Sequence, residues 1–124
     1  MTVSTLATDT TSSTTSSTTL VTDDGGITVH VAGDITTCTV AGSIDLSNAD
    51  VFREALGRGR TGDVVLDLTG VEFFGTAALT VVAALDAACA ERGSVLTVRI
   101  GDAVARVMVA ARWQPTARVV DVRG

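Results

Sequence analysis

The sequence contains no lysine, and it has only one proline, one histidine and one tryptophan among its 124 residues. Without lysine the chain cannot supply the phosphate-binding residue of a Walker loop, a Schiff base or a lysine acid–base catalyst. Its nine basic residues are all arginine, and 14 acidic residues outnumber them to give a net charge of −5. An acidic chain without a basic stripe interleaved with aromatic residues is not expected to bind nucleic acid directly.

Cysteine is also scarce, with Cys38 and Cys89 far apart and in no CxxC or zinc-binding spacing. This pattern indicates neither a disulfide framework nor a metal site, and it favours two small buried hydrophobic residues. The alternative hypothesis is a redox-active pair. His30 lies in the middle of an expected strand without a Ser or Cys motif beside it, so no catalytic triad is predicted. We expect a protein without metal, cofactor or enzymatic activity.

No hydrophobic run is long enough to cross a membrane, because the longest mostly apolar stretch, residues 77–90, is interrupted by Thr80 and Asp86. The N-terminus has neither the positive charge nor the apolar segment of a signal peptide. We therefore expect a cytoplasmic protein that does not bind a membrane.

The chain divides by composition into two parts. Residues 1–24 are dominated by threonine and serine. They have too few bulky apolar side chains to offset the entropy of ordering, so we expect a disordered tail. Residues 25–124 have the length of one ordinary domain, and we expect them to fold together.

Within this domain, strand and helix patterns alternate. Alternating apolar residues predict a hairpin over 27–31 and 35–41, and short apolar runs predict strands over 64–68, 95–100 and 119–122. The run over 64–68 is typical of a strand covered on both faces. Helical spacing predicts helices from about Ser47 to Leu56, from Thr76 to Arg92, and from Asp102 to before Trp113. This order predicts an α/β fold with a mixed β-sheet of four to five strands packed with about three to four α-helices.

Thr76 is the residue best placed for charge chemistry, because it is expected at the start of the long helix. There its hydroxyl can cap free N–H groups, and a phosphate on it would meet the positive end of the helix dipole. Added negative charge at an exposed surface blocks a partner and makes a switch without catalytic machinery. The plainer interpretation is an ordinary helix-capping threonine.

Four segments resemble the STAS domain, and within it the single-domain anti-sigma factor antagonists, also called anti-anti-sigma factors. They are AGSID at 41–45, VVLDLTGV at 64–71, FFGTAAL at 73–79 and AVARVM at 103–108. The resemblance implies a small mixed sheet with helices and a function by partner switching. The dephosphorylated antagonist binds an anti-sigma factor, usually a GHKL-type kinase, and frees a sigma factor. Phosphorylation of a Ser or Thr by that kinase ends the binding, so the resemblance implies a substrate rather than an enzyme.

In the family motif, D-S-S-G-L or D-S-T-G-L, the phosphoacceptor follows an aspartate. The resemblance places the acceptor on Thr76, with Gly75 at the aspartate position and Ala77 and Ala78 in place of the small polar residue and the glycine. Asp45 matches the acidic residue that ends the family's G-E-L-D turn. The expected partner-binding residues are Asp45, Ser47, Gly75, Thr76, Ala77 and Ala78. Because Gly75 removes the neighbouring carboxylate, phosphorylation of Thr76 remains open.

Two other functions stay open at this point. One is a STAS interaction module that scaffolds a stressosome-like or other signalling complex without meeting a sigma regulator. The other is redox control, in which Cys38 and Cys89 form a disulfide that alters the docking surface, and which requires Cα atoms within about 7 Å. In each case we expect the free protein to be a monomer.

Overall fold

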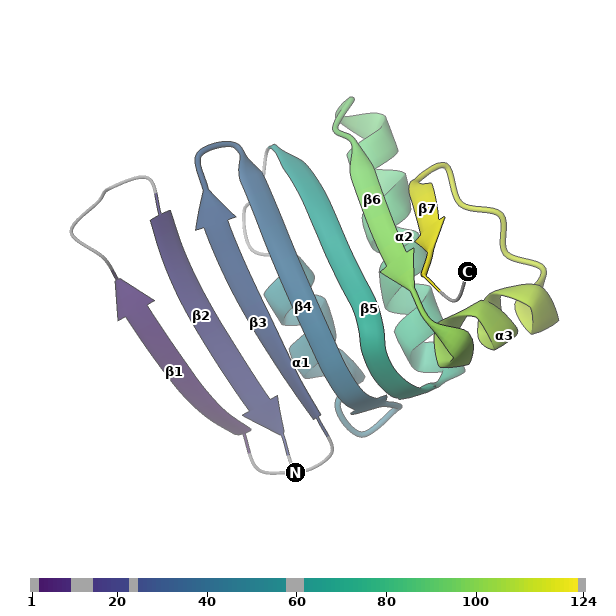
Figure 1. The fold of residues 1–124 in the computed structure, drawn as a ribbon, viewed down its shortest axis with the longest axis horizontal. Coiled ribbons are helices and arrows are strands. Elements are labelled where there is room, and N and C mark those ends of the chain that lie inside the picture. Colours follow the sequence, from purple (N-terminus) through teal and green to yellow (C-terminus); the bar gives the residue numbers. More distant parts are fainter. Residues whose placement is uncertain (1–2, 10–14, 23–24, 58–61, 123–124) are drawn as a thin grey trace.

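The computed structural model describes residues 3–9, 15–22, 25–57 and 62–122. Within these residues, seven strands form one sheet in chain order and three helices pack on it (Figure 1). The strands are β1 (Val3–Asp9), β2 (Thr15–Thr22), β3 (Gly25–Ala32), β4 (Ile35–Ile44), β5 (Asp63–Phe74), β6 (Leu96–Ile100) and β7 (Arg118–Asp121). The helices are α1 (Ala49–Gly57), α2 (Thr76–Glu91) and α3 (Asp102–Ala111).

The sheet is mixed: β1 to β4 are antiparallel neighbours, whereas β5, β6 and β7 each pair parallel to the preceding strand. The β3–β4 hairpin confirms the prediction made from the alternating apolar residues. Strands β3 to β7 and the three helices confirm the predicted α/β class, with a mixed sheet of four to five strands. Strands β1 and β2 extend this sheet beyond β3.

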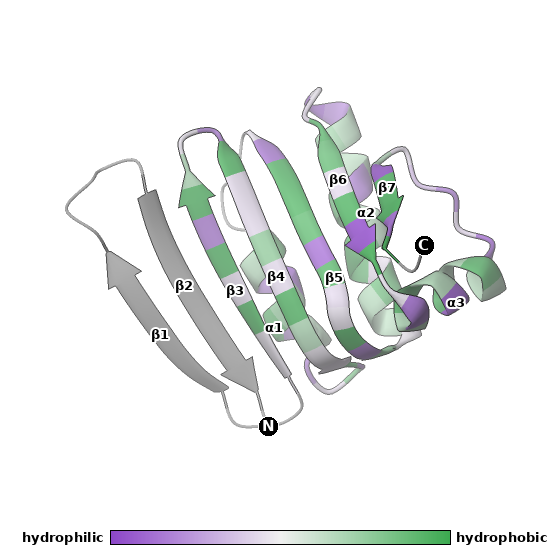
Figure 2. Cartoon of the chain, in the orientation of Figure 1, coloured by the Kyte–Doolittle hydropathy of each residue, from purple (hydrophilic) through white to green (hydrophobic). Residues whose placement is uncertain are grey.

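The helices cover only one face of the central strands. Along β5, Val64, Leu66 and Leu68 are buried while Val65 and Asp67 are half-buried. Figure 1 shows α1 and α2 behind the sheet, and Figure 2 shows a largely hydrophobic β5 with hydrophilic breaks. The prediction that residues 64–68 are covered on both faces is therefore wrong. Valine on the open face makes the run look continuously apolar, although only every second residue enters the core.

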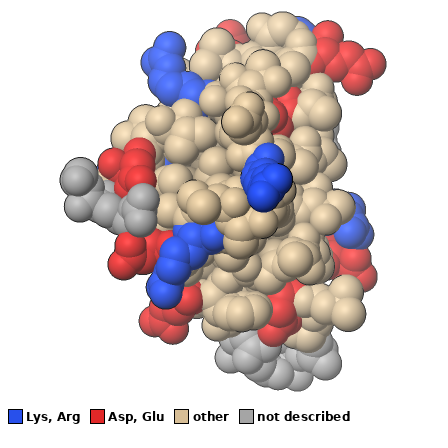
Figure 3. Space-filling view, turned by 90° about the vertical axis from the view of Figure 1, so that its right-hand side faces the viewer, with Lys and Arg blue, Asp and Glu red and all other residues tan. Residues whose placement is uncertain are grey.

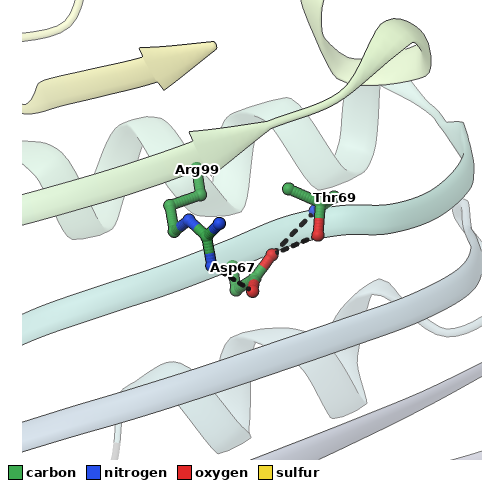
Figure 4. A network of polar contacts seen from close by, with 3 residues as sticks. All are labelled: Asp67, Thr69 and Arg99. Atoms are coloured by element: carbon green, nitrogen blue, oxygen red, sulfur yellow. Dashed lines mark hydrogen bonds and ion pairs between the residues drawn. The ribbon is translucent and has the colours of Figure 1, made fainter. Parts of the chain in front are cut away.

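The open face carries a polar network across β5 and β6 (Figure 4). Asp67 lies opposite Arg99 and accepts its Nη1 at 3.1 Å. It also accepts the N–H of Thr69 at 3.0 Å and the Thr69 hydroxyl at 2.6 Å. Partial burial raises the pKa of Asp67. The Thr69 donors and the Arg99 guanidinium together lower it by more, so the pKa lies below its ordinary value. The network fastens β5 at the point where its register with β4 shifts.

Beyond this point β5 continues to Phe74, well past the predicted end at Leu68. Gly70 and Phe74 lie opposite Ala41 and Ile44, so pairing with the long strand β4 carries β5 onward. Partner pairing of this kind is not visible in the hydrophobic pattern of β5 alone. It places the ends of β4 and β5 side by side.

Two segments of the expected tail over residues 1–24 have strand geometry, namely β1 and β2. The disorder expected for this tail stays a prediction. These strands pair antiparallel with each other, and β2 pairs with β3. Threonine and valine favour extended backbone, and the edge of β3 offers a ladder of hydrogen-bonding groups. Residues 1–2, 10–14 and 23–24 lie outside the described residues, and the division of the chain at residue 24 stays a prediction.

Candidate functional site

The candidate site lies where β4 and β5 end together. Ile44 pairs with Phe74, and the N–H of Gly75 donates to the Ile44 carbonyl at 2.8 Å. The turn after β4 and the start of α2 therefore meet at one edge of the sheet, where α3 also begins after β6. Between them is a groove of about 650 Å³. It is lined by Asp45 and Leu46 of the turn, Phe73 and Phe74 of β5, Gly75, Thr76 and Ala77 at the start of α2, and Val107, Ala110 and Ala111 of α3.

Polar side chains within the turn hold it in place. Asp45 Oδ1 accepts the N–H of Ser47 at 2.9 Å and its hydroxyl at 2.5 Å. Asn48 is 1% exposed, and its Oδ1 accepts the Asp45 N–H at 2.9 Å while its Nδ2 donates to the Ser43 carbonyl at 2.8 Å. These bonds give residues 45–48, which we call the Asp45 turn, a defined shape.

The start of α1 differs from the prediction. The Asn48 carbonyl accepts the Phe52 N–H at 3.2 Å, so Asn48 rather than Ser47 occupies the capping position. Asp50, in the first turn of α1, pairs with Arg53 at 2.6 Å. The Ser47 hydroxyl donates to Asp45. Together with the Ser47 N–H it lowers the pKa of the Asp45 carboxyl. Asp45 is consequently ionised at neutral pH.

Thr76 is the exposed first residue of α2 and does not cap it. Gly75 is the capping residue, with extended backbone and no side-chain hydrogen bond. The expected hydroxyl cap at Thr76 is absent from the described helix start because Thr76 already lies inside the helix. The first turn of α2 carries no acidic side chain among its described residues. The Thr76 hydroxyl thus lies at the rim of the groove and at the positive end of the helix dipole.

The remaining expected partner-binding residues separate into three positions. Ala77 is half-buried and lines the groove, as does Gly75. Ser47 is exposed and supports Asp45 rather than lining the groove. Ala78 is 0% exposed and faces the core, and its expected contact with a partner stays a prediction. Successive helical residues point about 100° apart, which turns Ala78 inward while Thr76 stays outside.

Sequence reasoning missed the apolar part of the site. Leu46 and Phe73 are exposed at the groove, and α3 contributes Val107, Ala110 and Ala111. The adjacent pair Phe73 and Phe74 carried a signal, because neighbouring residues in a strand point to opposite faces and one of the two had to lie outside. The contribution of α3 had no local signal, since it depends on how the helix packs after β6.

Both cysteines are buried free thiols. Burial raises the pKa of the Cys89 thiol, an effect that Arg92 only partly opposes. Because the thiolate is the reactive form, this environment disfavours oxidation. The redox hypothesis for Cys38 and Cys89 stays a prediction.

The described part of the chain holds no group of three or more His, Cys, Asp or Glu side chains placed to bind a metal ion. In those same residues, no helix combines the length and apolarity needed to cross a membrane. On the face toward β7 and α3, charged side chains of both signs are scattered around a broad uncharged surface (Figure 3).

This architecture is similar to that of known proteins. The fold is similar to that of an anti-sigma factor antagonist from Mycobacterium paratuberculosis, with a TM-score of 0.62 and 19% identity over 96% of this chain and 86% of that chain. No curated protein matches the sequence. The family model described as "Mlab, STAS domain" matches residues 19–120. Since that match spans most of the sequence, the chain belongs to this family of STAS domains.

Proposed function

We propose that this protein is an anti-sigma factor antagonist, which binds an anti-sigma factor in the groove beside Thr76 and thereby releases a sigma factor. The groove carries the proposal, because it gathers Asp45, Gly75, Thr76 and Ala77 around apolar walls. Its lining offers one carboxylate and one hydroxyl, which suits docking better than turnover. The fold shared with an anti-sigma factor antagonist supports the same role.

In this proposal the anti-sigma factor is a GHKL-type kinase that phosphorylates Thr76 and ends the complex. A phosphate carries nearly two negative charges. It would lie beside the ionised Asp45 and against apolar walls, so the partner would lose its fit by repulsion and desolvation. The protein is then a substrate rather than an enzyme, and it acts as a cytoplasmic monomer before it binds.

The test begins with capture of the tagged protein from its native cells and identification of the bound proteins. The recovered anti-sigma factor is purified and titrated with wild type, Thr76→Glu and Ala87→Glu. Ala87 is an exposed control on the same helix, outside the groove. We expect Thr76→Glu to weaken binding by about tenfold or more, and Ala87→Glu to bind like wild type.

Two results would contradict the proposal separately. Recovery of no anti-sigma factor rejects the function. Equal binding by wild type and Thr76→Glu rejects the switch at Thr76 while leaving the function intact.

A STAS module that scaffolds a stressosome-like or other signalling complex is the second candidate, and Gly75 favours it. The backbone at Gly75 has φ −75°, and an added Cβ would meet only ordinary contacts, the nearest 3.4 Å away at the Asp45 Cα and the Ile44 carbonyl oxygen. The fold therefore does not require glycine where the family motif has aspartate. A chain free of phosphorylation control would have no need of that carboxylate, and the identity of the captured partner separates the two functions.

A further inference from the structure

We infer that Leu46 is the main contact residue of the docking groove and that the Asp45 carboxylate is a positioning residue, which holds Leu46 in place. The inference rests on the proposed function, in which the groove receives an anti-sigma factor. The surface of that partner that faces the groove is then apolar, and Leu46 inserts into it.

Leu46 is the most exposed large hydrophobic residue among the described side chains, at 85%. A single exposed leucine is ordinary on a protein surface. This one lines a groove to which the exposed ring of Phe73 also belongs. Apolar residues of α3 continue the same surface, so Leu46 belongs to an apolar patch rather than to a scattered set.

The turn displays Leu46 on a braced backbone. The N–H groups on either side of it are both engaged: that of Asp45 donates to Asn48 Oδ1, and that of Ser47 donates to Asp45 Oδ1. The Asn48 side chain is itself buried and bonded to the Ser43 carbonyl. A turn whose backbone is held in this way loses little backbone freedom when its side chain binds, which favours Leu46 as an interface anchor.

The bonds of Asp45 point inward to the turn. One carboxylate oxygen takes both donors of Ser47, which lies on the far side of Leu46. These bonds require a hydrogen-bond acceptor at Asp45 Oδ1 more than they require a negative charge there. An amide oxygen at the same position would accept the same N–H, so the positioning role and a charged contact with the partner make different predictions.

The experiment compares Leu46→Ser, Asp45→Asn, Asp45→Ala and Ile35→Ser in titrations with the purified anti-sigma factor at low and high salt. Ile35 is a matched control, because it is 52% exposed and lies at the opposite end of β4. We expect Leu46→Ser to weaken binding by about thirtyfold. Asp45→Asn should bind nearly as well as wild type, Asp45→Ala several-fold more weakly, and Ile35→Ser unchanged. Wild-type affinity should vary little with salt, because apolar burial is not screened.

Binding by Leu46→Ser equal to that of wild type would overturn the inference. So would an Asp45→Asn variant as weak as Asp45→Ala together with a steep salt dependence, since both would mean that the charge itself meets the partner. Thermal unfolding of each variant shows whether the domain remains folded. If the wild type captures a protein other than an anti-sigma factor, the proposed function fails, and the same titrations with that protein decide the role of Leu46.

Discussion

Two aspartates perform the same local task in different surroundings. On α2 the carboxylate of Asp86, buried in the fold, accepts the N–H groups of Thr116 and Ala117 at 2.8 Å each. In the Asp45 turn the carboxylate accepts two donors of one serine at the surface. Asp86 ties the connection between α3 and β7 to the body of the domain, whereas Asp45 shapes a turn that displays Leu46. Burial makes the bonds of Asp86 costly to lose, whereas the exposed bonds of Asp45 fix the shape of a surface turn.

The largest effect is expected for Asp86→Ala. It leaves two partly buried N–H groups without their charged acceptor, so the free energy of unfolding should fall by about 3 kcal/mol. Urea denaturation measures the change. Asp50→Ala is the control, because its exposed pair with Arg53 should contribute less than about 0.5 kcal/mol. Equal losses of unfolding free energy in the two variants would mean that burial does not set how much an aspartate contributes to stability.

Asn48→Ala should lie between the two regions, since Asn48 is buried yet belongs to the turn. Loss of the side-chain bonds to Asp45 and Ser43 should cost about 1–2 kcal/mol of unfolding free energy. It should also weaken docking, because the Asp45 turn loses its support. Chemical denaturation and titration with the partner measure the two effects. A stability loss without any loss of docking would show that the shape of the turn is not needed for recognition.

Lowering the pH should have little effect on the carboxylates of Asp45 and Asp67 until the solution is strongly acidic. The pKa of Asp45 is lowered by the Ser47 donors, and that of Asp67 by Thr69 and Arg99 against the opposing effect of burial. A lowered folded-state pKa gives stability that is present above the unfolded value of about 3.9 and is lost as pH falls through the folded value. Unfolding free energy measured from pH 7 downward should therefore stay flat with respect to these groups until below about pH 4. An Asp67→Asn variant with the same acid slope as wild type would contradict this.

The smallest change in stability is expected for Gly75→Asp. The backbone suits any residue and the new Cβ fits, so the free energy of unfolding should change by less than about 0.5 kcal/mol. An aspartate at the capping position favours the helix, while the nearby Asp45 opposes it. Phosphorylation of Thr76 by the recovered kinase should increase, as measured by intact-protein mass. A large loss of stability would mean that the local fold depends on glycine.

Much of the fold followed from local patterns. The β3–β4 hairpin, the long helix α2 and the order of elements follow from alternation, helical spacing and turn residues, whose causes lie within a few residues of chain. The strand geometry of β1 and β2 had no such local signal, because the pairing of β2 depends on the edge of β3. The cap of α1 by Asn48 was missed because it depends on bonds to Asp45 and Ser43.

The sequence by itself determined which residues are apolar, where α2 starts and that Thr76 lies near that start. The tertiary structure alone decided what surrounds Thr76. Parallel pairing of Ile44 with Phe74 brings the Asp45 turn beside Gly75, and packing of α3 supplies the third wall of the groove. It also decided that Ala78 faces inward while Leu46 faces solvent. The physical reason is that helical periodicity and strand alternation assign a residue to a face, whereas only the contact of distant segments determines what that face meets.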